Sequence, residues 1–373
     1  MRVLLAAGGT AGHVNPALAI AGGLRTRWPG AEIHFAGRNA GMEHALVEQA
    51  GYAFHPIEVR GIQRSLSPQS MARNAAAAWY LAWAPGTARR ILRTVQPQLV
   101  VGCGGYVSGP VLREAARAGI KTAIHEQNAF PGVTNKLLAK QVDKVFAPNA
   151  AAAARLAAPG KTLITGNPVR SEVRGANRAA AREALGAEGR VVLLSFGGSL
   201  GAMRLNQVVA ELAAWHLQNR DFLHIHATGS IEKDDFAALA RRLGIDAAPG
   251  FVVREYIDDM PALLAAADLV ICRAGALTLA ELAAAGRAAV LVPSPNVAEN
   301  HQYFNALEFA KAGAARVFEE KELDGKRLID EVDGLTADVA VLEEMGRCAK
   351  TLDKPHALDD ILGALEALVG EGQ

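Results

Sequence analysis

The segments "LLAAGGTAG" (Leu4–Gly12) and "LLSFGGSLG" (Leu193–Gly201) repeat one pattern about 190 residues apart in a chain of 373 residues. Each begins as a short apolar run typical of a buried strand, passes through a loop with three glycines, and leads into a helix-like stretch. A strand, a glycine loop and a helix in this order open a doubly wound parallel sheet. Two such openings at this spacing predict two similar Rossmann-like domains.

Apolar runs of strand length alternate with helix-like stretches along the whole chain, which favours an α/β architecture with parallel sheets. We expect strands at "VLLAA", "EIHFAG", "QLVVGCG" and "KTAIHE" in the first half, and at "VVLLSF", "FLHIHAT", "DLVICR" and "AAVLVP" in the second. Helices are expected over His13–Arg25 and Leu205–Leu217. Asn167-Pro168 breaks the periodicity and predicts domains over 1–166 and 167–354, with a C-terminal helix near 355–373 that could pack back on the first.

Composition indicates a globular protein, with 50% hydrophobic and 21% charged residues. Three scattered cysteines without a C-x-x-C pair favour a reducing compartment over disulfides or a zinc site. No signal peptide is visible, and the longest apolar stretch, 75–84, is shorter than the ~20 residues that span a bilayer. We therefore expect a cytosolic or peripheral protein.

Charge is divided unevenly: residues 1–170 carry a net +12 and residues 171–373 a net −11. A basic N-terminal half predicts an anionic partner, such as nucleic acid, a phosphorylated ligand or anionic lipid. A dipolar molecule without such a partner is the alternative.

Three glycine-rich loops, "GGTAGH", "GCGGYVSGP" and "GGSLGA", are candidate phosphate sites, because glycine lets a helix N-terminus approach an anion closely. None matches the P-loop or the G-x-G-x-x-G pattern, and "AGRNAG" after the second strand lacks the acidic residue that binds an NAD ribose. Tight strand-to-helix turns are the structural alternative.

A second constellation, "VICRAGALTLAEL" (Val270–Leu282), runs from a buried strand through small residues into a helix. Glu281, about two turns along this helix, could chelate a ribose diol, or it could be an ordinary surface glutamate. Asp258-Asp259 before Pro261 predicts a helix cap, and Ile257 could offer backbone groups to a base. The amides of Gln302 and Asn305 suit sugar hydroxyls or a capped helix start.

These blocks, together with "HEQNAFPGVTNK", "GNPVR", "YIDDM" and "NHQYFNALEFAKAGAA", resemble the MurG family in the same order over nearly the whole chain. The resemblance implies the GT-B fold, with two Rossmann-like doubly wound domains facing a deep cleft. It implies an inverting transfer of N-acetylglucosamine from UDP-GlcNAc to the C4 hydroxyl of undecaprenyl-diphosphate-MurNAc-pentapeptide in peptidoglycan synthesis. The implied partners are these two substrates and anionic inner-membrane lipids at the cytoplasmic face, with no nucleic acid.

Site residues carried over from the resemblance fall into three groups. For UDP-GlcNAc, Glu281 would hold the ribose, Ile257 the uracil through its backbone, and Ser199 with Arg170 the diphosphate. The remaining donor contacts implied are Thr10, Ala11, Gly12, Asn128, Ala276, Leu277, Thr278, Leu279, Ala280, Gln302 and Asn305. The acceptor diphosphate would meet Gly9, Gly104, Gly105, Tyr106 and Ser108. The chain departs from the commonest family pattern at Ala11, Leu200, Ala274 and His301.

Candidate catalytic residues are His13 and Glu126. A neutral His13 could accept the acceptor proton, a cationic one could hold the acceptor diphosphate, and a structural His13 would only order its loop. Glu126 is the rival base. The helix after "GGSLG" and Arg170 could stabilise departing UDP, and with no D-x-D motif we expect neither a cofactor nor an essential metal.

Aromatic and apolar residues alternate with arginines between Arg64 and Arg90, including Met71, Arg73, Trp79 and Trp83. This pattern suits shallow insertion into an anionic leaflet, or equally an Ala-rich helix buried in the first domain. Other functions considered are a different UDP-sugar transferase acting on a lipid acceptor, a UDP-GlcNAc 2-epimerase, and a non-catalytic UDP-sugar-binding membrane scaffold.

Overall fold

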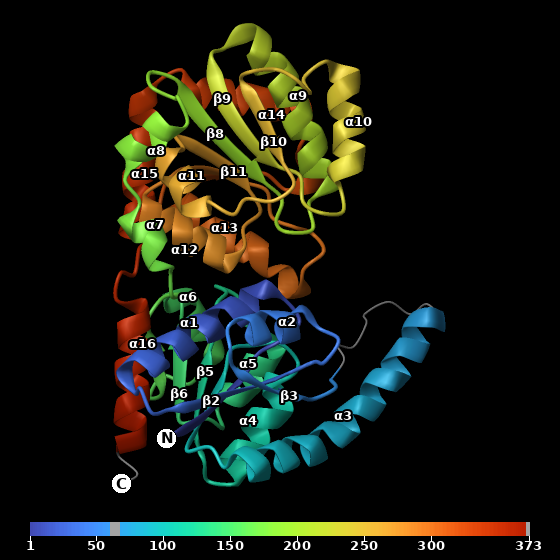
Figure 1. Cartoon of the computed structure of the whole chain (residues 1–373), viewed down its shortest axis with the longest axis vertical. Helices are drawn as coiled ribbons and strands as arrows, with labels where there is room; N and C mark the ends of the chain where they lie inside the picture. The colour runs from blue at the N-terminus through green and yellow to red at the C-terminus, as the bar shows by residue number, and fades with distance from the viewer. Residues whose placement is uncertain (60–67, 371–373) are drawn as a thin grey trace. The chain divides into compact units, whose positions relative to one another are not determined.

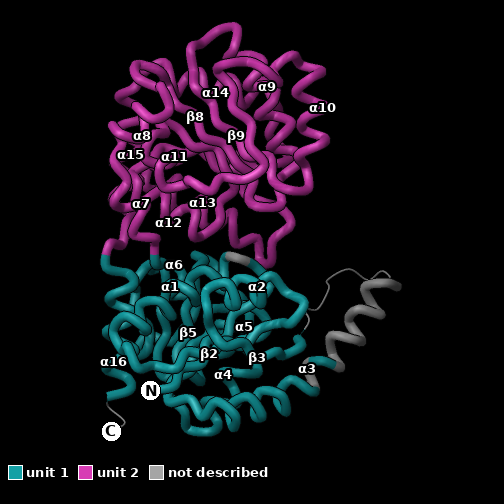
Figure 2. The backbone as a smooth tube through the Cα atoms, viewed as in Figure 1, with its two compact units in different colours: residues 1–168, 356–373 teal, residues 169–355 magenta. Residues whose placement is uncertain are grey.

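The computed structural model describes residues 1–59 and 68–370, without the side chains of residues 11, 68–79, 81 and 82. The chain folds into two compact units, each with its own sheet and core (Figure 2). The first unit comprises residues 1–168 and the segment from His356 onward, and the second comprises Val169–Pro355. The chain therefore passes between the units twice, at Pro168-Val169 and at Pro355-His356.

The first unit contains a parallel sheet with strand order β3-β2-β1-β4-β5-β6-β7 (Figure 1). The strands are β1 (Arg2–Ala6), β2 (Glu32–Gly37), β3 (Ala53–Pro56), β4 (Leu99–Gly102), β5 (Lys121–His125), β6 (Lys144–Ala147) and β7 (Thr162–Ile164). The helices are α1 (Ala11–Arg27), α2 (Met42–Gln49), α3 (Pro68–Val95), α4 (Ser108–Arg117), α5 (Val133–Ala139), α6 (Ala150–Leu156) and α16 (Ala357–Gly370).

The second unit contains a parallel sheet with strand order β10-β9-β8-β11-β12-β13. The strands are β8 (Val191–Phe196), β9 (Phe222–Ala227), β10 (Phe251–Arg254), β11 (Leu269–Cys272), β12 (Ala288–Leu291) and β13 (Ala315–Val317). The helices are α7 (Ser171–Gly175), α8 (Arg178–Ala184), α9 (Met203–Asn219), α10 (Lys233–Leu243), α11 (Met260–Ala266), α12 (Ala276–Ala285), α13 (His301–Lys311), α14 (Gly325–Thr336) and α15 (Val339–Thr351), with short 3₁₀ turns at Ala298–Asn300 and Glu320–Glu322.

Both sheets reverse their strand order next to the first strand of the unit, which confirms the predicted pair of doubly wound domains. In the first unit β1 pairs with both β2 and β4, and in the second β8 pairs with both β9 and β11. Ligands of open α/β sheets bind at such switch points, beyond the carboxyl ends of the strands. The loops after β1 and β4, and those after β8 and β11, are therefore the places to look for a site.

Apolar side chains fill both faces of each sheet, as parallel strands require. On one face of the first sheet, Ile20 and Leu24 of α1 pack with Leu362 of α16. A Cβ at Gly23 would lie 2.5 Å from Leu362 Cδ1, so the glycine allows α16 to approach α1 closely. Arg27 adds ion pairs to two acidic residues of α16, at 3.2 and 3.0 Å. The C-terminal helix is thus part of the first unit's core.

A chain of buried histidines crosses the core of the second unit. Ser195 Oγ lies 2.7 Å from His224 Nε2 and 2.8 Å from His226 Nδ1, and His224 Nδ1 lies 3.3 Å from His216 Nε2. The serine and the three histidines are all buried, and they are surrounded by Phe251 and other aromatic rings. Burial lowers the pKa of His216 to about 4, of His226 to about 3, and of His224 well below its usual value. The cluster is therefore neutral in the folded protein.

We expect this cluster to make the protein labile in mild acid. A histidine whose pKa is lowered by folding binds fewer protons folded than unfolded, so its contribution to stability is lost as the pH falls below about 6.5. His216 and His226 alone lower the free energy of unfolding by roughly 3–4 kcal/mol between pH 7 and pH 5, and His224 acts in the same direction. Urea unfolding at both pH values measures this difference. Replacing the exposed His356 by glutamine is the control, and this variant should show the same decrease in the free energy of unfolding as the unmodified protein. An equal free energy of unfolding at the two pH values would contradict it.

Candidate active site

The loop between β1 and α1 fixes the His13 imidazole in one orientation. Nδ1 of His13 lies 3.1 Å from the carbonyl oxygen of Gly8 and 3.3 Å from Oγ1 of Thr10. Because a carbonyl oxygen can only accept, Nδ1 carries the hydrogen, and in the neutral ring Nε2 is left as an acceptor. Burial lowers the pKa of His13, opposed by the Gly8 carbonyl and by the charge of Glu43. The ring is therefore suited to accept a proton at Nε2.

The loop between β4 and α4 packs directly on the first one, as the strand order requires. Gly104 and Gly105 have φ of +100° and +79°, a region that L side chains rarely adopt. A Cβ at Gly105 would lie 2.2 Å from the oxygen of Gly8, and one at Gly104 would lie 3.0 Å from His13 Nε2. Glycine is thus required here by both conformation and space.

The predicted acceptor-diphosphate residues differ in how accessible their side chains are. The Ser108 hydroxyl is buried, accepts from the N–H of Gly104 at 3.1 Å, and lies 2.9 Å from the oxygens of Ala6 and Gly104. It therefore ties the loop together. Tyr106, in contrast, is 53% exposed, and Gly9, at φ +91°, has open space where a Cβ would stand. Tyr106 and the backbone at Gly9 are thus accessible parts of this loop pair, whereas the Gly104 N–H is already bound to Ser108.

Glu126, the rival base, organises the loop between β5 and α5. Its Oε1 accepts from the N–H groups of Gln127 and Asn128 and from Asn128 Nδ2 at 3.0, 2.9 and 3.2 Å. Its Oε2 accepts from the N–H of Gly132 at 3.1 Å and from Asn135 Nδ2 at 2.8 Å. The side chain is 2% exposed. Five N–H donors therefore hold both oxygens, and Asn128 is oriented by this carboxylate.

Gln127 is a residue that we missed in the sequence. Its Nε2 donates to the backbone carbonyl oxygens of Cys103 and His125 at 3.0 and 2.9 Å. Its backbone carbonyl oxygen accepts from Asn167 Nδ2 at 3.0 Å. It therefore links the loops after β4 and β5. A glutamine beside the candidate Glu126 in "HEQN" was the available signal.

In the second unit, two residues assigned to different parts of the donor are paired with each other. Arg170 Nε and Nη2 lie 2.9 and 2.8 Å from Oε1 of Glu281. Burial raises the pKa of Glu281, while the neighbouring Arg170 opposes the shift. The Glu281 side chain is 18% exposed and that of Arg170 is 51% exposed. The two charges thus form one accessible pair beside α12.

Two amide side chains of α13 hold neighbouring loops, Asn305 the turn before α12 and Gln302 the loop after β12. Asn305 is buried and donates from Nδ2 to the oxygen of Ala274 at 3.2 Å, and Gln302 Oε1 accepts from the N–H of Ser294 at 2.9 Å. The predicted residues Ala276, Leu277, Thr278, Leu279 and Ala280 form the first turns of α12. Asn305 therefore positions the turn before α12, and neither Asn305 nor Gln302 caps a helix start.

Backbone strain marks the segment before α13. Glu299 and Asn300 are consecutive left-handed residues with φ of +56° and +51°. Such conformations cost of order 1–3 kcal/mol each and cluster where a site demands them. The strain lies two residues before Gln302, a predicted sugar contact.

The loop after β8 has an exposed Ser199 and an open helix start. Gly198 and Gly201 have φ of +98° and +93°, and a Cβ at Gly201 would lie 2.3 Å from the oxygen of Thr228. Ala202 precedes α9 without a side-chain cap. Uncapped N–H groups at the start of a long helix suit an anion.

The expected helix cap at Asp258-Asp259 is correct in position but not in its hydrogen bond. Asp259 does stand at the N-terminus of α11, but its carboxylate makes no capping hydrogen bond. Instead it accepts from Arg254 at 2.6 Å. The nearby Ile257 side chain is buried in the core, which leaves its backbone as the part that could meet a base.

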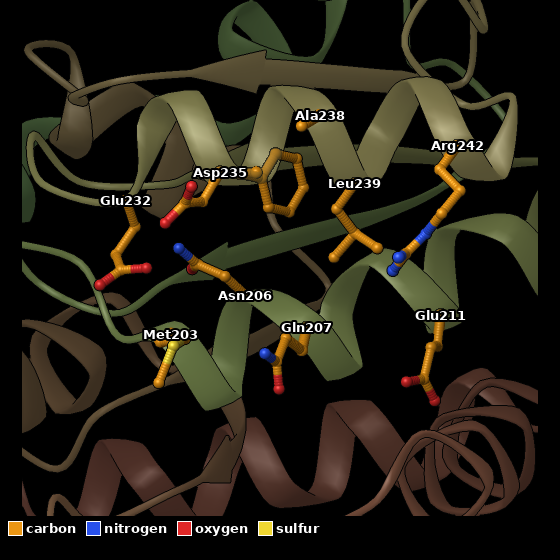
Figure 3. Close-up of a pocket in the computed structure, with 10 residues that line it drawn as sticks. Met203, Asn206, Gln207, Glu211, Glu232, Asp235, Ala238, Leu239 and Arg242 are labelled. Atoms are coloured by element: carbon orange, nitrogen blue, oxygen red, sulfur yellow. The ribbon is translucent and has the colours of Figure 1, made fainter.

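A pocket of about 560 Å³ opens between α9 and α10 in the second unit (Figure 3). Its rim carries Glu211, Glu232, Asp235 and Arg242. None of the predicted substrate ligands lines it. The pocket is therefore separate from the Arg170–Glu281 pair.

The predicted membrane segment is only partly described. Trp83 on α3 is 61% exposed, while Ala84 and Ala88 are buried in the core of the first unit. Arg64 lies outside the described residues, and the side chains of Met71, Arg73, Trp79 and Leu81 lie outside the described side chains. Across the part of the chain that the structure describes, no helix combines the length and apolarity needed to span a bilayer.

Comparison with known proteins identifies the family. Residues 3–147 match the glycosyltransferase family 28 N-terminal domain, and residues 192–361 match its C-terminal domain. The chain is 43% identical, over the full length of both, to the Desulforudis audaxviator UDP-N-acetylglucosamine–N-acetylmuramyl-(pentapeptide) pyrophosphoryl-undecaprenol N-acetylglucosamine transferase. It is 41% identical to the enzyme of that name from Acetivibrio thermocellus, over 97% of this chain and 96% of the relative. The chain belongs to the MurG family.

Solved structures agree with membership in the MurG family. MurG of Acinetobacter baumannii superposes with a TM-score of 0.77 at 29% identity, covering 98% of this chain and 99% of that one. A protein described as a putative UDP-N-acetylglucosamine 2-epimerase from Listeria monocytogenes superposes with a TM-score of 0.69 at 15% identity, over 99% of this chain and 97% of that one. The second likeness shows the shared fold alone. The GT-B architecture expected from the MurG resemblance is confirmed.

Proposed function

We infer that this chain transfers N-acetylglucosamine from UDP-GlcNAc to the undecaprenyl-diphosphate-linked N-acetylmuramyl-pentapeptide, the step that completes the lipid-linked disaccharide of peptidoglycan. The observation that carries this inference is 43% identity over the whole length to a relative with that name. The chain is a hexosyltransferase on the same ground. The roles of individual residues below are proposals that rest on the site geometry.

Donor binding is assigned to the second unit. A carboxylate accepts both hydroxyls of a diol, and Glu281 presents one beside the start of α12. Arg170 holds Oε1 of this carboxylate and keeps it charged against the effect of burial. With its guanidinium half exposed, Arg170 can also face the diphosphate, as can the N–H groups at the start of α9 beyond Ser199.

Proton transfer is assigned to His13. The acceptor C4 oxygen bonds to the anomeric carbon while the bond from that carbon to the diphosphate oxygen breaks, which inverts the centre. The hydroxyl proton passes to Nε2 of His13, and UDP leaves with the bonding electron pair. Glu126 is less suited to this role, because five N–H donors already hold its oxygens.

The test is transfer with defined substrates. Purified protein, UDP-GlcNAc and a short-chain polyprenyl-diphosphate-muramyl-pentapeptide should yield UDP and the β(1→4) disaccharide in equal amounts. The same acceptor without its C4 hydroxyl is the matched control and should yield neither. Epimerised UDP-sugar, or UDP release that ignores the acceptor, would contradict the proposal.

We propose that the chemistry needs no metal, since Arg170 and the α9 N-terminus supply positive charge where the diphosphate departs. The rate of transfer is expected to stay within about twofold when EDTA replaces added divalent cations. Initial rates in both buffers measure this. A loss of activity in EDTA that Mg²⁺ restores would contradict it.

Binding to anionic lipid at the cytoplasmic face of the membrane is a further part of the proposal. The basic first half and the exposed Trp83 support it. Replacing Trp79 and Trp83 by alanine should lower the fraction that sediments with phosphatidylglycerol vesicles by about tenfold. Trp215, a partly buried tryptophan of the second unit, gives a control variant. Unchanged sedimentation of the double variant would remove the insertion model in favour of a buried helix.

A further inference from the structure

Glu43, which the reaction as proposed does not use, is a buried carboxylate beneath the first glycine loop. It lies in the first turn of α2, and its side chain is 1% exposed. Oε1 accepts from the N–H of Arg38 at 3.1 Å, whereas Oε2 is buried without a hydrogen-bond partner among the described residues. A buried charge that lacks full hydrogen bonding is costly, so its presence needs a reason.

Three glycines leave the space that this carboxylate occupies. A Cβ at Gly8 would lie 2.6 Å from Oε1, one at Gly41 would lie 2.1 Å from Oε2, and one at Gly37 would lie 2.9 Å from Cγ. None of these distances is compatible with a side chain larger than hydrogen. The carboxylate is therefore in contact with Gly8, whose carbonyl accepts the Nδ1 hydrogen of His13.

The negative charge of Glu43 also acts on the imidazole itself. Among the described groups, Glu43 is the one whose charge raises the pKa of His13 against the effect of burial. The other titratable groups near this end of the sheet include Arg38, whose Nε is buried without a hydrogen-bond partner among the described residues, Cys103 and His44. The Cys103 thiol is buried with its pKa raised to about 12, and His44 is engaged with Glu48 at 3.2 Å.

We propose that Glu43 is a positioning residue for His13: its carboxylate packs against Gly8, the residue whose carbonyl orients the imidazole, and places a negative charge beneath that loop. The proposal rests on the proposed function, in which His13 takes the acceptor proton. It also explains why a carboxylate is retained where an apolar side chain would pack at lower cost.

The experiment is the Glu43→Gln variant, which keeps the shape and the acceptor for Arg38 but removes the charge. The titration of His13, followed by NMR of the imidazole Cε1–H and assigned with His13→Gln, should shift downward by about half to one pH unit. The acid limb of kcat/KM should move down by the same amount. Glu114→Gln is the matched control, because Glu114 is 6% exposed and pairs with Arg89 and Arg117. Removing the charge of Glu114 should change neither the His13 titration nor the acid limb of kcat/KM.

The two readouts separate the possible failures. An unchanged His13 titration in folded Glu43→Gln protein overturns the positioning role, whatever the activity. If wild-type protein forms no disaccharide, the proposed function fails while the NMR shift still decides the role of Glu43. Should Glu43→Gln not fold, Glu43→Asp, which retracts the charge, is expected to give a smaller downward shift, and no shift would overturn the proposal.

Discussion

Replacement of His13 by glutamine is expected to lower kcat for disaccharide formation by about 10²- to 10⁴-fold. Glutamine can still donate to the Gly8 carbonyl, so the loop should keep its shape, but its amide has no basic nitrogen at the position of Nε2. The KM for UDP-GlcNAc should stay within about threefold, because the proposed ribose and diphosphate ligands, Glu281 and Arg170, belong to the second unit. Steady-state kinetics with the short-chain acceptor measures both parameters.

The pH dependence of the rate is a second test of His13 as the base. Since burial lowers the pKa of His13, the active neutral ring persists below pH 6.5, and the wild-type acid limb should lie below that value. His44→Gln, a change at another histidine of the first unit, should leave kcat unchanged. A His13→Gln variant with normal kcat and a raised acceptor KM would instead identify His13 as a phosphate ligand. Normal kinetics with a lowered Tm would identify a structural residue.

The central strands of each sheet could be predicted from the sequence, whereas the edge strands β3, β7, β10 and β13 were missed, as was the buried strand β6 next to one edge. Strands such as β1 and β11 are buried on both faces and read as continuous apolar runs. Strands β7 and β10 are three and four residues long, and Ile164, Val252 and Val253 are at least 37% exposed. These strands form because a neighbouring strand offers hydrogen bonds, so their sequences lack the continuous apolar run that would predict a buried strand.

The same division holds in the candidate site. Glycine loops were located correctly because their backbone demands are local, as at Gly104 and Gly105. The roles of the carboxylates were harder to see, because distant partners decide them. Glu126 is held by donors up to nine residues away, and Glu43 fills space left by Gly8, which lies on another strand's loop. A glutamate two residues after Gly41, in "AGRNAGME", was the one signal available for Glu43.

Replacement of Glu281 by glutamine is expected to raise the KM for UDP-GlcNAc by about 10- to 100-fold and to weaken UDP binding by the same factor. The carboxylate would accept two charge-assisted hydrogen bonds from the ribose diol, and an amide oxygen accepts them more weakly. Stability should change by less than about 1 kcal/mol, because Arg170 is half exposed and water can solvate it once its partner is gone. Isothermal titration with UDP and thermal unfolding measure the two effects separately.

A comparison of UDP with 2′-deoxy-UDP assigns the lost affinity to the ribose. Wild-type protein should bind UDP about tenfold more tightly than the deoxy compound, whereas the Glu281→Gln variant should bind both equally. Glu308→Gln on α13, which breaks only a surface pair with Lys311, should keep the wild-type discrimination. Arg170→Ala should also keep a preference for UDP while lowering kcat, because Arg170 acts on the diphosphate charge that grows as the sugar departs. If Glu281→Gln still distinguished the two nucleotides, the ribose would have to be held elsewhere and the Arg170–Glu281 pair would be a structural contact.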